Sequence, residues 1–185
     1  MSLGELNPKS NGRNIAGCMR LIESHSLSAS TASTTFSNIP SSFNHLQIRG
    51  IARTDYGNNY DYVAVSFNGD YGYANCSYEA FEADGTTAAI LNSSSFGYIQ
   101  AGFIAGGSTT ANYAGAFVFN FPFYTNNSFF KNMNFISGNV GGSFFAAGSG
   151  QWFKAAIQTI SSITLQPSLG SNFVAGTSFS LYGIT

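Results

Sequence analysis

The sequence predicts an all-β protein: an antiparallel β-sandwich, jelly-roll-like, of about ten short strands, with an extended N-terminal arm. Aromatic residues, which favour pleated strands, make up 16% of the chain, and Gly, Ser, Thr and Asn are abundant, which favours turns over helices. Short apolar segments recur at roughly 8–15-residue spacing with turn signals between them, as in sandwiches and barrels. No segment keeps helical periodicity beyond two or three turns.

The chain divides into an expected arm over residues 1–20 and a sandwich domain over residues 21–185. Its 185 residues suffice for one domain with its own core. Residues 1–17 carry turn signals and no sustained periodicity. As an arm, this segment would bind a groove of a neighbouring subunit, whereas a terminus without fixed structure explains the same sequence equally well. The partner-binding candidates within it are Leu3, Leu6, Pro8 and Ile15.

Four strands are expected in the first part of the domain. They lie in residues 18–28, 34–40, 45–53 and 63–67. The third alternates cleanly between apolar and polar positions, which is typical of a strand with one buried face. Asn68-Gly69 follows the fourth and predicts a hairpin, because a type I′ turn needs positive φ at both central positions.

The remainder of the chain continues the same pattern of strands and turns. Residues 74–83 fit either a strand or a short helix, and Asp84-Gly85 marks a turn after them. Further strands are expected over residues 96–105, 113–123, 129–137, 142–149, 151–159, 160–167 and 177–184.

The segment 113–123 is apolar at alternate positions and nearly apolar at the others. Phe117, Phe119, Phe121 and Phe123 are expected on one face. The opposite face carries Ala116, Val118 and Pro122, so we expect this strand to be buried on both faces.

Low charge predicts a protein whose sheet edges are covered. Charged residues make up 8% of the chain, against about 25% in ordinary soluble domains. Few Lys or Pro stand where exposed edges need protection, so loops, the arm or further copies must cover them, and a homo-oligomer, a trimer, is expected. The net charge is −1 without a basic run, and no apolar segment is long enough to span a membrane, so neither nucleic acid nor membrane is an expected partner.

No catalytic, metal or cofactor motif is present, and the chain is predicted not to be an enzyme. A Gly-x-Ser-x-Gly elbow is missing, and His25 and His45 are expected to be ordinary polar strand residues. Aspartates in the Asp-Tyr-Gly, Asn-Gly-Asp and Asp-Gly contexts are expected to serve turn geometry. The alternative is a pair of facing carboxylates of a glycosidase, drawn from Asp55, Asp61, Asp70, Glu79, Glu82 and Asp84. Cys18 and Cys76 are either a pair or two buried thiols, and two thiols are favoured.

Tyrosines near the first predicted hairpin are the remaining candidates for a binding site. Tyr56, Tyr60, Tyr71 and Tyr73, together with Tyr62, cluster there in sequence. Exposed Tyr rings stack on sugars or bind proteins, and core packing is the alternative. Trp152 is expected in the core.

Four segments share a recognisable order of motifs: TTFSNIPSSFNHLQIRGIAR, SFNGDYGYANCSY, NFPFYTNNSFFKNMNF and QWFKAAIQTISSITLQPSLGSNFVAGTSFSLYGIT. They resemble segments of a family of phage and marine-virus virion structural proteins, and the last segment, with its terminal Ser-Leu-Tyr-Gly-Ile, matches best. The similarity runs through residues 21–185 in order. Residues 1–20 lie outside the shared pattern, and the strand FNFPFY is more aromatic than its family counterpart.

The resemblance implies a β-sandwich made in the host cytoplasm and carried on the outer surface of the particle. One expected function is that of a capsid decoration (cement) protein, which binds the major capsid protein and stabilises the phage head. The alternative is a tail-fibre or receptor-binding module that recognises host surface glycans. The resemblance carries no catalytic residues and does not choose between these functions.

Overall fold

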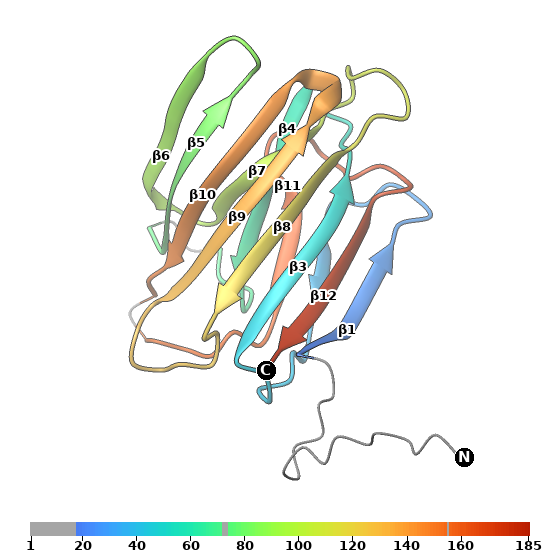
Figure 1. The fold of residues 1–185 in the computed structure, drawn as a ribbon. Coiled ribbons are helices and arrows are strands. Elements are labelled where there is room, and N and C mark those ends of the chain that lie inside the picture. The colour runs from blue at the N-terminus through green and yellow to red at the C-terminus, as the bar shows by residue number, and fades with distance from the viewer. Residues whose placement is uncertain (1–17, 72–73, 155) are drawn as a thin grey trace, which may run out of the picture.

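The computed structural model describes residues 18–71, 74–154 and 156–185, and these form two antiparallel sheets packed face to face (Figure 1). The all-β sandwich prediction is confirmed. The larger sheet has eight strands in the order β1-β12-β3-β8-β9-β10-β5-β6. Their bounds are β1 (Met19–Ser26), β12 (Ser178–Ile184), β3 (His45–Ala52), β8 (Gly115–Pro122), β9 (Lys131–Asn139), β10 (Phe144–Trp152), β5 (Cys76–Ala83) and β6 (Ala88–Phe96).

The smaller sheet lies behind the larger one in Figure 1 and has four strands in the order β2-β11-β4-β7. These are β2 (Thr34–Phe36), β11 (Ile163–Pro167), β4 (Tyr60–Phe67) and β7 (Ile99–Ala105). A 3-10 turn, Val140–Gly142, joins β9 to β10. The described residues thus hold twelve strands, where the sequence predicted about ten.

The strand order is that of a jelly roll with two inserted hairpins. When β5–β6 and β9–β10 are set aside, β1-β12-β3-β8 faces β2-β11-β4-β7. In this arrangement the first strand pairs with the last and the second with the last but one, as in eight-stranded jelly rolls. The two hairpins both add to the β8 side of the larger sheet, so they widen it beyond the smaller one.

Aromatic side chains fill the space between the sheets. Phe117, Phe119 and Phe121 alternate along β8 and are all buried, and the rings of Phe117 and Phe119 stack at 4.4 Å. Each such ring contributes roughly 1.5–3 kcal/mol through burial. The β4 residues Val63, Val65 and Phe67 complete this core from the other sheet.

Three strand predictions need correction. β8 is buried on one face only, because Ala116 is exposed and Val118 half-buried, and the chain turns at Phe123, whose ring is 61% exposed. The predicted strands 142–149 and 151–159 are one strand, β10, which ends at Trp152, and β6 was missed. Residues 74–83 hold the strand β5 rather than a helix.

Two predictions about chain boundaries and turns are also refined. Strand β1 begins at Met19, so the predicted arm boundary at residue 20 falls inside a strand. Asn68 and Gly69 do have positive φ, +52° and +68°, and Asp70 N–H donates to Phe67 at 2.8 Å, as in a type I′ turn. This turn does not form a hairpin of long strands, because β4 and β5 belong to different sheets.

Candidate functional site

Five of the predicted partner-binding residues lie outside the described residues. They are Leu3, Leu6, Pro8, Ile15 and Tyr73. Their predicted role in binding a partner stays a prediction.

The structure separates the other predicted tyrosines. Tyr60 begins β4 and packs edge-to-face against Tyr62 and Phe103, at centroid distances of 5.6 and 5.2 Å. Tyr71 follows the opposite end of the same strand and is 49% exposed. Tyr56 lies half-buried in the β3–β4 loop, where its carbonyl accepts hydrogen bonds from Asn58 and Gly107. The sequence cluster is therefore not a single surface.

Two carboxylates hold the loop between β11 and β12. Asp61 is fully buried and accepts backbone hydrogen bonds from Tyr62, Leu169 and Gly170 at 2.7–2.9 Å. Asp55 accepts from the backbone of Ser171 and Asn172, and these bonds keep the pKa of its carboxyl below the usual value. Because each accepts several backbone donors, both acids serve loop geometry.

Asp70 and Asp84 also serve turns. Asp70 accepts a 2.8 Å hydrogen bond from the indole of Trp152 and two from Asn75, which ties the β4–β5 connection to the end of β10. Asp84 accepts from the backbone N–H groups of Thr86 and Thr87 in the β5–β6 turn, and these bonds hold its pKa well below the ordinary value. The turn interpretation of these acids fits their contacts.

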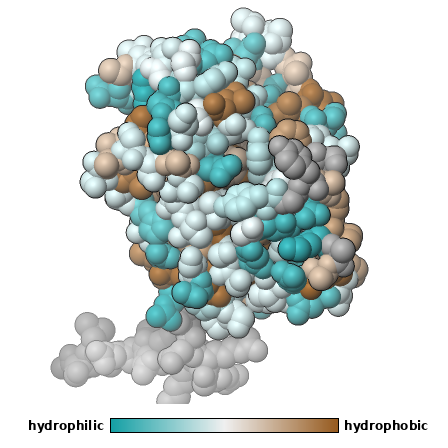
Figure 2. Space-filling model, turned by 180° about the vertical axis from the view of Figure 1, so that it is seen from behind, coloured by the Kyte–Doolittle hydropathy of each residue, from teal (hydrophilic) through white to brown (hydrophobic). Residues whose placement is uncertain are grey.

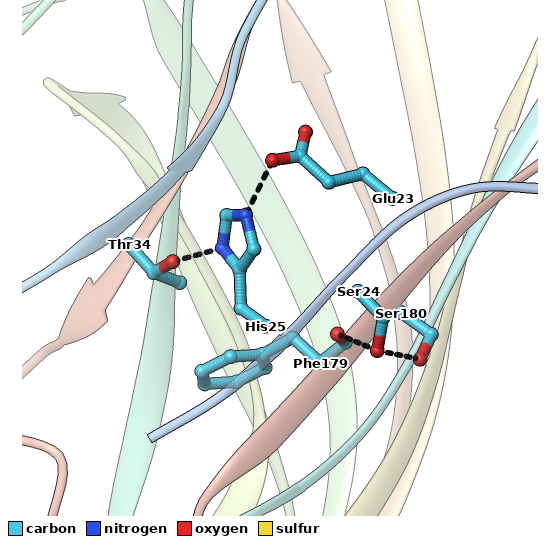
Figure 3. Close-up of polar contacts among 6 residues, drawn as sticks. All are labelled: Glu23, Ser24, His25, Thr34, Phe179 and Ser180. Atoms are coloured by element: carbon cyan, nitrogen blue, oxygen red, sulfur yellow. Dashed lines mark hydrogen bonds and ion pairs between the residues drawn. The ribbon is translucent and has the colours of Figure 1, made fainter. Parts of the chain in front are cut away.

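A histidine links the edge strands of the two sheets. His25 on β1 lies between Glu23, whose carboxylate is 2.6 Å from Nε2, and the hydroxyl of Thr34 on β2, which contacts Nδ1 (Figure 3). The imidazole also stacks on Phe36 at 4.6 Å. Hydroxyl, imidazole and carboxylate follow the order of a nucleophilic triad. His25 on β1 contacts Thr34 and the buried ring of Phe36 on β2, so these contacts join the edge strands of the two sheets.

The described residues hold neither a candidate metal site nor a disulfide. No group of three or more His, Cys, Asp or Glu in them is placed to hold a metal ion. Cys18 and Cys76 are both free thiols, as the favoured prediction had it. Cys76 is buried, and burial raises the pKa of its thiol to about 12. Cys18 is exposed, so the prediction that both thiols are buried is wrong for Cys18. No helix among these residues is long and apolar enough to cross a membrane.

The outward face of the larger sheet carries a continuous apolar area. Cross-strand pairing places Ile90, Phe81, Ala147, Ile136 and Val118 in one row across β6, β5, β10, β9 and β8. The adjacent row adds Phe145 and Ile51, with only Gly and Ala between them. We call this area the apolar face; its large exposed members are Ile51 (48%), Phe81 (51%), Ile90 (66%), Ile136 (49%) and Phe145 (41%).

The apolar face ends at an unprotected sheet edge. Strand β6 is the last strand of the larger sheet, and its sequence AAILNSSSF has no charged residue and no Pro. Strand β1, at the other edge, carries Arg20 and Glu23. Both edge strands have a register shift against their neighbours, so the charges alone distinguish them. Charged side chains protect edge strands from pairing, so β6 is the open edge and β1 the protected one.

On the side of the smaller sheet, hydrophobic residues are distributed differently. Figure 2 views the molecule from behind, and there the hydrophobic colour occurs in separate patches among white and teal atoms. Two faces of one sandwich therefore differ, and the apolar face lies on the larger sheet.

The same outward face is polar toward the C-terminal ends of β8 and β10. Gln47, Asn120 and Asn134 form a hydrogen-bonded ladder across β3, β8 and β9, with distances of 2.6 and 2.9 Å. Beside it lies a groove of about 450 Å³. Its lining includes the polar residues Ser77, Glu79, Asn92, Asn132, Ser149 and Gln151. Amides, hydroxyls and one carboxylate are hydrogen-bonding groups suited to sugar hydroxyls.

Three further exposed rings, none of them a predicted binding residue, stand on the β8–β9 loop. Phe123 (φ +47°), Phe129 and Phe130 are 61%, 72% and 41% exposed. The buried ammonium of Lys131 holds the loop by donating to the carbonyls of Asn126 and Phe129. A bulky residue at positive φ was not readable from the alternating Phe pattern, which continued through Phe123.

Comparison with protein families, curated proteins and solved structures finds no match to this chain.

Proposed function

We propose that this chain is a non-catalytic structural protein of a virus particle, a capsid decoration protein that assembles into a homo-oligomer on the outer surface of the head. The apolar face and the open β6 edge beside it carry this proposal. Monomers rarely expose contiguous apolar patches of this kind, and larger ones mark protein contacts. Further support comes from the jelly-roll topology, which viral capsid domains use, and from the resemblance of residues 21–185 to virion proteins.

The occupant proposed for the apolar face is a second copy of this chain. The face has no charged side chain among its members, so its partner must also be nearly uncharged there. The chain itself meets this requirement, and β6 can continue its sheet into a neighbouring copy. Light scattering should give the mass of three chains, and a stable monomer at micromolar concentration would contradict the assembly.

Attachment to the major capsid protein is proposed for the residues that precede strand β1, residues 1–17. Deleting residues 1–17 should abolish binding to particles while the sandwich still folds and assembles. Retained binding by this deletion variant would remove the arm from the proposal without affecting the contact between copies.

The location on the particle is the decisive test. An antibody raised against the purified chain should label the heads of intact particles of the virus that encodes it. Particles without any label would overturn the proposal that this is a virion protein.

A second candidate function, a tail-fibre module that binds host glycans, is favoured by the polar groove. Label on the tail, together with hits on a glycan array that Asn132→Ala or Gln151→Ala removes, would establish it. An array without hits and label on the head would exclude it.

A further inference from the structure

A pocket opens between the inserted β5–β6 hairpin and the jelly-roll core. It has a volume of about 260 Å³ and lies against the inner face of the hairpin, opposite the start of β4. We call it the hairpin pocket; it is lined by Tyr60, Tyr62, Glu82, Asp84, Phe103 and Phe144, with small side chains completing the hairpin side.

Aromatic rings form the core side of the hairpin pocket. The rings of Tyr62 and Phe103 stack at 4.8 Å, and Tyr60 meets Phe144 at 4.5 Å. Tyr62 and Phe103 are nearly buried, and Tyr60 and Phe144 are half-buried, so the cluster is fixed by the core and faces the pocket at its margin. The π faces of such rings carry partial negative charge.

The charged groups of the pocket are all acidic. Glu82 points inward from β5, because it pairs with the buried Ala146 on the inner face of β10. The hydroxyl of Tyr62 lies 3.3 Å from its carboxylate, and among the described residues no Lys or Arg lines the pocket. Burial raises the pKa of Glu82 to about 7, although the Tyr62 hydrogen bond acts in the opposite direction. A half-buried carboxylate without a cation is costly, and a cationic ligand would relieve that cost.

We propose that the hairpin pocket binds a small organic ammonium ion, of the size of choline or of one amino-sugar ring. The cation would pair with the carboxylate of Glu82 and lie against the aromatic rings, which attract cations within about 6 Å of the ring centroid. Asp84 at the turn adds negative charge on the hairpin side. A neutral ligand would leave Glu82 unpaired, and an anion would be repelled by both acids.

Titration calorimetry with choline, glucosamine and glucose tests this directly. At pH 7.5 at least one of the two ammonium compounds should bind and glucose should not. Binding of glucosamine alone indicates that Glu82 requires an N–H donor, and binding of choline alone indicates that the rings dominate. Absence of binding by both at millimolar concentration, or equal binding of glucose and glucosamine, would overturn the proposal.

Two substitutions locate the binding at this pocket. Glu82→Gln keeps the shape of the side chain and should weaken ammonium binding at least ten-fold. Glu23→Gln removes a carboxylate at the opposite edge of the larger sheet and should leave binding unchanged. Unaltered affinity in Glu82→Gln, with the unfolding temperature also unaltered, would place the ligand elsewhere and refute the assignment.

Proton release provides a readout that a structural role of Glu82 would not produce. The titratable groups around Glu82 are Asp84 and the hydroxyls of Tyr60, Tyr62 and Tyr78. Burial raises the pKa of Tyr62 and Tyr78, so both stay protonated near neutral pH. Cation binding lowers the pKa of Glu82, and protons should be released at pH 7, measured as a heat that depends on the buffer. Binding without proton release would count against the contact with Glu82.

Discussion

At the residue scale, the few charged groups of this protein bind backbone more than they bind each other. Asp61 is the clearest case, because it is fully buried and its partners are three backbone N–H groups. Lys131 is the positively charged counterpart, because its ammonium group donates hydrogen bonds to two backbone carbonyls of the β8–β9 loop. Charge in this chain is therefore used to fix loops that would otherwise bury unsatisfied polar groups.

Replacing Asp61 tests this use of charge. Asp61→Ala leaves two backbone donors in the β11–β12 loop and the N–H of Tyr62 in β4 without this acceptor, and we expect a loss of about 3 kcal/mol in the free energy of unfolding. Urea unfolding monitored by the fluorescence of Trp152 measures it. Glu79→Ala, an exposed acid on β5, is the control and should change stability by less than about 0.5 kcal/mol.

Glu82 gives stability a defined dependence on pH. Its pKa is about 7 in the folded chain and close to 4.5 when unfolded, so the folded state holds the proton more tightly. The free energy of unfolding should therefore fall as pH rises from about 4.5 to about 7. Subtracting the profile of Glu82→Gln from that of the natural chain isolates this effect from the histidines, and a difference that is flat with pH would contradict it.

At the element scale, alternation predicted the strands well, and glycines caused the main errors. The predicted strands 142–149 and 151–159 leave out Gly150, which lies inside β10. A Cβ on Gly150 would lie 2.4 Å from Ile99 of the facing sheet, so the glycine there permits close packing and makes no turn. Strand β6 was missed because its second half is a run of Asn and Ser, which fits a loop as well as a strand at a sheet margin.

The packing role of Gly150 can be measured. Gly150→Ala forces its new methyl group into Ile99, and we expect a loss of about 1–3 kcal/mol in the free energy of unfolding. Gly138→Ala is a matched control in the adjacent strand β9, because the nearest atom to its Cβ lies at 3.7 Å. Equal stability of the two variants would show that the sheets adjust to the methyl group.

The open edge of β6 makes a separate prediction. Ile90→Lys adds a charge to a 66% exposed position on this strand, and charged side chains discourage strands from pairing at an edge. The variant should fold normally by circular dichroism and run as a monomer in light scattering. Arg20→Lys on the protected edge strand β1 should leave the mass unchanged.

At the scale of the whole molecule, the jelly roll depends on contacts between distant parts of the chain. The last strand, β12, lies between β1 and β3. Strand β1 therefore cannot join the larger sheet until the end of the chain is in place. Local alternation could predict the strands but not this pairing, nor that two hairpins widen one sheet. The candidate site was harder still, since the predicted tyrosines are divided between the two ends of β4 and the apolar face emerges only from the register of five strands.

Truncation of the last strand, β12, would test how far the stability of the fold depends on it. Removing residues 178–185 takes Phe179 and Leu181, both fully buried, out of the core and leaves β1 without a partner. We expect no cooperative unfolding transition and poorly dispersed NMR spectra. Removing Thr185 alone loses a single backbone hydrogen bond to Cys18 and should leave the fold intact.

The two cysteines have a practical consequence. Cys18 is exposed beside the end of β12, whereas Cys76 is buried at the start of β5 with its thiol held protonated. A maleimide dye added to the native protein should therefore attach once, and the second attachment should wait until β5 leaves the sheet. Mass spectrometry that counts the attached dyes over time would therefore measure the rate at which the inserted β5–β6 hairpin opens.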